Sequence, residues 1–103
     1  RKGDLKLNLS SQRFFMVEGS EESEIDLTPL EFRLIKVFLQ NEDHVLSRDQ
    51  LIDKAWKQGV HVTDRVVDIH ISELRKKLGD AGKLIRTVYG SGYCFSLEHR
   101  KSA

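Results

Sequence analysis

The hydrophobic pattern is most regular between Thr63 and Leu78, where apolar residues recur at the spacing of one helical face. That stripe consists of Val67, Ile71, Leu74 and Leu78. The opposite, outward face is expected to carry Arg65, Ile69, Ser72, Glu73 and Lys76. Such a face suits a DNA major groove, because cations, hydroxyls, carboxylates and branched apolar groups all find partners on phosphates, base edges and thymine methyls. A charged surface helix with one stray isoleucine has the same pattern, so this stretch alone leaves both interpretations open.

Strand-like patterns precede the helices. Asp4–Leu9 alternates strictly, with leucine at every second position, and predicts a half-buried strand. Arg13–Val17 is rich in aromatic and β-branched residues and predicts a second strand, while Glu24–Leu27 predicts a short third one. The segment Glu18–Glu24 has no apolar side chain and is expected to form a solvated acidic loop. Together these segments predict a small antiparallel sheet.

A strong helix start follows the predicted sheet. Thr28 is the expected N-cap, Pro29 the first helical residue, and Glu31 completes a capping box. The helix is expected to run to about Gln40. Its inner face would consist of Phe32, Ile35, Phe38 and Leu39.

Two further helices are predicted from their end signals. Ser47 and Gln50 form a second capping box, and this helix is expected to end near Gln58–Gly59. Its apolar side chains are Leu51, Ile52, Ala55 and Trp56. Thr63 then caps the long helix described above, and Gly79 ends it.

A hairpin is predicted at the end of the chain. Its strands are Leu84–Val88 and Tyr93–Leu97, joined by the glycine-rich tip Tyr89–Gly92. Three helices followed by a hairpin are the order of an α+β winged helix-turn-helix, with a small antiparallel sheet ahead of it. We therefore expect residues 1–103 to form one such domain. Its parts would be the sheet (1–27), a three-helix core (28–79) and a β-hairpin wing (84–97).

The charges are divided unevenly although the net charge is only +1. Residues 1–43 hold six basic and nine acidic side chains, whereas residues 44–103 hold eleven and seven. A surface that faces a polyanion is therefore expected in the second half. The sequence contains no run of about 18 apolar residues and no secretory signal pattern. The single cysteine, Cys94, allows no internal disulfide and fits a reducing compartment.

Nothing in the sequence supports catalysis, a metal site or a cofactor. Cys94 has no cation or base beside it, as a reactive thiol would. Gly90 and Gly92 open no helix, so they do not form a phosphate-binding loop. The histidines lack the spacing of metal ligands; they are His44, His61, His70 and His99.

Four segments resemble the DNA-binding output domain of response regulators of the OmpR/PhoB type. They are LTPLEFRLIKVF at Leu27–Phe38, VLSRDQLIDKAW at Val45–Trp56, DRVVDIHISELRKKL at Asp64–Leu78 and IRTVYGSGYCF at Ile85–Phe95. The resemblance implies a cytoplasmic domain that follows a receiver domain absent from this sequence. It also implies binding to double-stranded promoter DNA on direct repeats, as a tandem dimer of domains that are monomeric in isolation.

The resemblance also implies roles for individual residues. The helix at 63–78 would enter the major groove, with base edges read by Ile69, Ser72 and Glu73. The wing at 87–93 would lie on the backbone or in the minor groove. Contacts to DNA, mostly to phosphates, are expected from Trp56, Arg65, His70, Arg75, Thr87, Gly90 and Tyr93, to which the outward Lys76 and the wing-tip Tyr89 are added. The loop expected to contact RNA polymerase consists of Lys57, Gln58, Gly59, Val60, His61 and Val62.

Three residues depart from the family pattern. Glu73 is acidic where a cation or neutral group would suit DNA better, Tyr89 replaces a basic wing-tip residue, and Lys57 replaces a glycine. Trp56 has a second interpretation as a cap on the edge of the core, and His70 as a structural residue. Two alternative functions also stay open: a winged helix used for protein–protein contact, and the DNA-binding domain of a membrane-anchored, ToxR-like activator.

Overall fold

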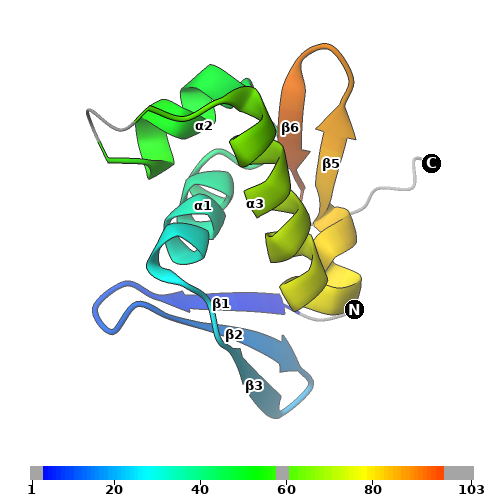
Figure 1. The fold of residues 1–103 in the computed structure, drawn as a ribbon. Coiled ribbons are helices and arrows are strands. Elements are labelled where there is room, and N and C mark those ends of the chain that lie inside the picture. Colours follow the sequence, from blue (N-terminus) through cyan, green and yellow to red (C-terminus); the bar gives the residue numbers. More distant parts are fainter. Residues whose placement is uncertain (1–3, 58–60, 97–103) are drawn as a thin grey trace, which may run out of the picture.

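The structure is a computed structural model that describes residues 4–57 and 61–96. Within these residues, two three-stranded antiparallel sheets lie at opposite ends of the molecule with the α-helices between them (Figure 1). The helices are α1 (Pro29–Gln40), α2 (Arg48–Ala55) and α3 (Asp64–Leu78). Three helices followed by a β-hairpin confirm the predicted winged-helix arrangement.

The N-terminal sheet has the order β1 (Asp4–Asn8), β2 (Arg13–Glu18), β3 (Glu21–Ile25). The first two strands were predicted, although Leu9 lies beyond β1 and is exposed rather than half-buried. The prediction of an acidic loop over Glu18–Glu24 was wrong, because β3 covers most of it. The third strand exists as predicted, but it spans Glu21–Ile25 instead of Glu24–Leu27. Pairing with β2 explains this strand, since Ile25 lies opposite the buried Phe14.

Helix α1 begins as predicted. Thr28 Oγ1 accepts from the Glu31 amide, and Glu31 Oε1 accepts from the Thr28 amide at 2.9 Å. The helix is buried more widely than the predicted inner face, because Leu34 and Val37 are buried as well, whereas Leu39 is only half-buried. Its buried apolar residues are Phe32, Leu34, Ile35, Val37 and Phe38. The shared core accounts for this wide burial, because all of these except Phe32 belong to one cluster with Phe14 of β2, Leu51 of α2 and Phe95 of the wing.

Helix α2 starts at the predicted Ser47 cap but ends earlier than predicted. Trp56 is its C-cap and has extended backbone angles. Arg33 of α1 donates from Nε to the Ala55 carbonyl at 2.6 Å, which satisfies one of the free carbonyls at this helix end. The predicted end at Gln58–Gly59 lies outside the described residues.

Helix α3 matches its prediction closely. All four residues of the predicted stripe are buried, and Thr63 Oγ1 accepts from the Val66 amide as the N-cap. Gly79 ends the helix with a φ of 61°, a value that favours glycine. The chain then forms the 3-10 helix η1 (Gly79–Leu84), which connects α3 to the wing.

The wing has three strands where two were predicted. β5 (Ile85–Val88) and β6 (Gly92–Phe95) form the hairpin, and β4 (Val45–Leu46), from the α1–α2 connection, pairs with the other side of β6. Because β6 is therefore the central strand, all four of its residues are buried. Leu97, predicted to end this strand, lies outside the described residues.

Candidate nucleic-acid interface

The outward face of α3 is exposed as the sequence predicted. Its five exposed residues are Arg65, Ile69, Ser72, Glu73 and Lys76. Ile69 keeps 51% of its surface accessible, because the buried stripe occupies the other side of the helix. Glu73 lies 3.7 Å from the Lys76 ammonium, one helical turn along, so its negative charge has a cation beside it.

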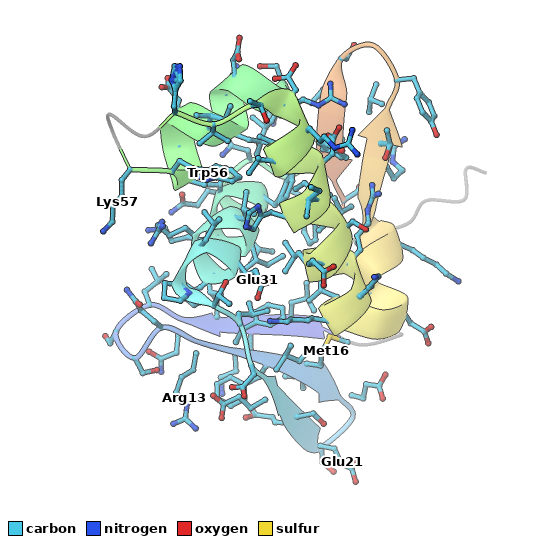
Figure 2. The ribbon with its side chains drawn as sticks, viewed as in Figure 1. Arg13, Met16, Glu21, Glu31, Trp56 and Lys57 are labelled. Atoms are coloured by element: carbon cyan, nitrogen blue, oxygen red, sulfur yellow. The ribbon has the colours of Figure 1, made fainter. Side chains whose placement is uncertain are left out.

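One flank of this face is formed by Trp56 and His70. Their rings meet edge to face at a centroid distance of 5.6 Å, and both residues are half-buried. The His70 Nδ1 atom lies 2.9 Å from the Val66 carbonyl oxygen. Nδ1 must carry a proton to donate there, which leaves Nε2 for an outside partner. Figure 2 shows Trp56 at the end of α2, so both interpretations of this tryptophan are compatible with its position.

The other flank joins α3 to the wing. Arg75 donates from Nε to the Ile85 carbonyl at 3.0 Å and from Nη2 to Thr87 Oγ1 at 2.9 Å. Its guanidinium carbon also lies 5.4 Å from the centre of the Tyr93 ring. The structure therefore brings together Arg75, Thr87 and Tyr93, which the sequence could only name separately.

Tyr93 is buried and its hydroxyl has a partner inside the protein. The hydroxyl donates to Asp68 Oδ1 at 2.6 Å. Burial, together with this hydrogen bond to a carboxylate, raises the pKa of the Tyr93 hydroxyl. While this bond is made, the hydroxyl proton is not free for a phosphate.

Asp68 and Arg48 are the two residues of this region that sequence reasoning missed. Arg48 donates from Nε to Asp68 Oδ1 at 2.8 Å and from Nη2 to Oδ2 at 3.2 Å. The Arg48 guanidinium holds the pKa of the Asp68 carboxyl below its usual range. Asp68 is the residue after the buried Val67, so the sequence places it at the border of the buried stripe of α3. Nothing else in the sequence indicates that it pairs with Arg48.

The tip of the wing is formed by Tyr89, Gly90 and Ser91. The Ser91 amide donates to the Val88 carbonyl at 2.9 Å, and Gly90 has a φ of 83°. Tyr89 is 91% exposed. Figure 1 shows this tip at the same end of the molecule as α2 and the start of α3. The wing tip thus carries an aromatic side chain, Tyr89, that is almost fully exposed to solvent.

The predicted polymerase-contact loop is described only at its ends. Lys57 and His61 are exposed and Val62 is half-buried, while Gln58, Gly59 and Val60 lie outside the described residues. Figure 2 shows the Lys57 side chain pointing away from the helices.

Among the described residues, no group of His, Cys, Asp and Glu side chains is arranged to hold a metal ion. Nor does this part of the chain contain a helix with the length and apolarity needed to cross a membrane. Cys94 is buried in β6.

Comparison with known proteins places the chain in a family. A family model described as "Transcriptional regulatory protein, C terminal" matches residues 21–95. The phosphate regulon transcriptional regulatory protein PhoB of Klebsiella pneumoniae is 40% identical over 94 residues, which cover 89% of this chain and 39% of that protein. The chain thus spans about two fifths of this relative.

Solved structures agree with this assignment. The DNA-binding domain of Escherichia coli CadC has a TM-score of 0.75 and 34% identity, covering 95% of this chain and 91% of that one. The Klebsiella pneumoniae RstA DNA-binding domain, solved in complex with the RstA box, has a TM-score of 0.76 and 27% identity, with coverages of 95% and 96%. The chain therefore belongs to the OmpR/PhoB-type family of transcriptional regulatory protein C-terminal domains.

Proposed function

We propose that this chain is a sequence-specific double-stranded DNA-binding domain of a transcriptional regulator, and not an enzyme. The observation that carries the proposal is the division of α3 into a buried apolar stripe and an exposed, chemically mixed face. A helix supported in this way can enter a major groove, with α2 crossing the DNA backbone as the first helix of a helix-turn-helix.

The reading face of the proposal consists of Ile69, Ser72 and Glu73. Ile69 offers an apolar surface to a thymine methyl, Ser72 a hydroxyl, and Glu73 an acceptor for the cytosine N4 amino group. The contact between Glu73 and Lys76 supports this role, because the cation offsets the repulsion that a lone carboxylate would meet near phosphates.

Backbone contacts are proposed on either side of that face. Trp56 and His70 would contact phosphates on one flank, and Arg75 and Thr87 on the other. Arg75 uses two of its five N–H donors within the protein and keeps the others for DNA. Because the Tyr93 hydroxyl donates its hydrogen bond to Asp68, we propose that Tyr93 acts chiefly by holding the Arg75 guanidinium over its ring. Arg65 and Lys76 complete the set from α3, with Gly90 and Tyr89 at the wing tip.

The regulator around this domain is proposed from the relatives. Since the chain spans 39% of the Klebsiella pneumoniae PhoB protein, we propose that it is attached to a receiver domain of a two-component system in the cytoplasm. RNA polymerase would contact the loop that includes Lys57 and His61. The isolated domain would be a monomer and would form a tandem dimer on direct repeats, with half-sites about one helical turn (about 10–11 bp) apart.

Salt-dependent DNA binding tests the proposal. If four to six phosphates are neutralised per domain, the logarithm of the association constant should fall against the logarithm of the salt concentration with a slope of about −4 to −5. Fluorescence anisotropy on a pool of promoter duplexes gives this slope. Absence of binding at low salt on every duplex would contradict the proposal and favour a role in protein–protein contact.

The spacing of the repeats tests the tandem arrangement separately. Insertion of about 5 bp between half-sites rotates one site to the other face of the duplex and should abolish cooperative binding. Cooperativity that survives the insertion would contradict the head-to-tail arrangement while leaving DNA binding itself intact.

A further inference from the structure

Arg48 occupies the point where α2, α3 and the wing meet. It is the first residue of α2, its guanidinium forks onto Asp68 of α3, and its Cζ atom lies 5.9 Å from the centre of the Tyr93 ring in β6. Arg75 approaches the same ring at 5.4 Å. Two guanidinium groups therefore share one aromatic ring at this junction, within the range at which a cation is attracted to a π system.

Arg48 has hydrogen-bond donors to spare. A guanidinium carries five N–H groups, and the fork onto Asp68 uses two of them. The Arg48 side chain is 35% exposed, and within residues 4–57 and 61–96 no buried side-chain nitrogen or oxygen lacks a partner, so Arg48 Nη1, which the fork does not use, reaches solvent. A fixed guanidinium with outward donors is the geometry that binds phosphate oxygens well.

The position of Arg48 in the fold supports the same partner. In a helix-turn-helix the first helix crosses the DNA backbone, and here that helix is α2, with Arg48 at its N-terminal end. The N-terminal ends of helices also favour anions. The other acidic group near the guanidinium is Asp64, in the first turn of α3. The Asp68 carboxylate orients the Arg48 guanidinium, and with Asp64 only nearby, Arg48 can still donate to a further partner.

We propose that Arg48 is a DNA phosphate-binding residue, and that Asp68 and Tyr93 are the positioning residues that aim it. This inference rests on the proposed function, since it names a backbone contact of the same DNA-binding surface. It extends that surface from α3 and the wing to the start of α2.

A purely structural ion pair is the competing explanation, and the chain supplies a matched control for it. Arg13 forks onto Glu24 in the same way, from Nε at 2.9 Å and Nη2 at 2.6 Å. That pair lies on the N-terminal sheet, at the opposite end of the molecule from the wing (Figure 1). Arg13→Gln therefore removes the same kind of bond without removing a cation from the proposed DNA surface.

The experiment measures DNA affinity against salt for the wild type, Arg48→Gln, Arg48→Lys and Arg13→Gln. If Arg48 contacts a phosphate, Arg48→Gln should weaken binding by about tenfold or more and reduce the magnitude of the salt slope by about 1. Specific and non-specific duplexes should lose affinity alike, because a phosphate carries no sequence information. Arg48→Lys should keep the wild-type slope, because it keeps the charge, and Arg13→Gln should match the wild type.

A wild-type slope in Arg48→Gln, with or without weaker binding, would overturn the proposal. The proposed function itself would fail differently, because the wild type would then bind no duplex. In case Arg48→Gln does not fold, Arg48→Gln/Asp68→Asn leaves no uncompensated carboxylate and is compared with Asp68→Asn alone. A slope reduced by about 1 supports the phosphate contact and an unchanged slope overturns it.

Discussion

The two arginine forks of this molecule, Arg13–Glu24 and Arg48–Asp68, have similar geometry and very different surroundings. The first joins the central strand β2 to the edge strand β3 of the N-terminal sheet, where the Arg13 side chain is more than half exposed and the Glu24 carboxylate has no further described partner. The second is tied to the buried Tyr93 and links three elements. The same arginine–carboxylate pair is thus an exposed surface ion pair on the sheet and part of a contact between three elements at the wing.

The difference extends to the regions around them. On the N-terminal sheet, acidic and basic side chains of different strands pair with each other, as Lys6 of β1 does with Glu22 of β3. At the junction of α3 and the wing, Arg48 and Arg75 share the Tyr93 ring, only Arg48 pairs with a carboxylate, and each arginine has N–H donors left over. We infer from this contrast that the first region satisfies its charges internally, whereas the second holds them ready for an anion.

The largest expected effect separates the two hairpins. A Cβ on Gly92 would lie 2.0 Å from the Leu46 carbonyl oxygen, and the glycine has a φ of 139°. Gly92→Ala should therefore lower the free energy of unfolding by about 3 kcal/mol or more through strain and overpacking. In the N-terminal hairpin, Gly19 has open space around its Cβ position, so Gly19→Ala should cost only about 1 kcal/mol, from its positive φ. Urea unfolding measures both, and equal losses would contradict the close pairing of β4 and β6.

The next effect contrasts a buried carboxylate with an exposed one. Glu31, 4% exposed, accepts from the Lys77 ammonium at 2.7 Å and joins α1 to α3. Glu31→Gln should lower the free energy of unfolding by about 1–3 kcal/mol, whereas Glu24→Gln on the sheet should cost less. A larger loss for Glu24→Gln would contradict this assignment of roles.

The same residue predicts the response to acid. Burial opposes ionisation of Glu31, but hydrogen bonds from Lys77 and from the Thr28 amide outweigh it and lower the pKa of the carboxyl. Its stabilising effect is therefore complete above the pKa of the unfolded chain, about 4.3. It is lost as the pH falls through the lower pKa of the folded state. Unfolding curves between neutral and acid pH should show this loss, and Glu31→Gln should make it smaller.

A third test compares two exposed glutamates. Glu73→Ala should weaken the specific site by about 1–3 kcal/mol and relax the preference at one base pair, if Glu73 accepts from cytosine N4. Glu21 lies in the β2–β3 hairpin, at the end of the molecule away from the helices in Figure 2. Glu21→Ala should therefore leave both the affinity and the base preference unchanged. Binding of both variants to a randomised duplex library checks this. Uniformly tighter binding by Glu73→Ala would show that the carboxylate only repels phosphates.

The smallest expected effect concerns the hairpin tips. Tyr89→Arg adds a cation at the wing tip and should steepen the salt dependence of DNA binding by about one unit of slope. Tyr89→Phe should leave the slope unchanged, because it adds no charge. Ser20→Arg adds the same cation at the exposed tip of the β2–β3 hairpin and should have no effect. A steeper slope in Ser20→Arg would mean that the N-terminal sheet also lies close to DNA.

The same two regions show what sequence reasoning can reach. The α3 stripe was predicted residue by residue, because a long amphipathic helix repeats its pattern over several turns. The strand β3 was predicted at Glu24–Leu27 instead of Glu21–Ile25, because Glu and Ser are poor strand formers and the pairing with β2 decides where the strand begins. A two-residue strand such as β4 shows no period, and its partner β6 lies far along the chain.

The candidate site was predictable to a similar extent. The exposed face of α3 follows from helical geometry once the stripe is known. The junction does not, since Arg48 and Asp68 belong to different helices and meet only in the folded chain. The resemblance supplied Arg75, Thr87 and Tyr93 as separate DNA contacts. The hydrogen bonds from Arg75 to Thr87 and from Tyr93 to Asp68 became visible only in the folded structure.

The central claim is that DNA is bound by the α2–α3–wing region and not by the N-terminal sheet. Amide chemical shifts of the isotope-labelled protein, followed by NMR during titration with a single-site duplex, test it most directly. The account predicts that the largest shifts fall on the start of α2, on α3 and on the wing tip, while β1, β2 and β3 stay close to their free positions. Shifts concentrated on the N-terminal sheet, or spread evenly over both regions, would contradict it.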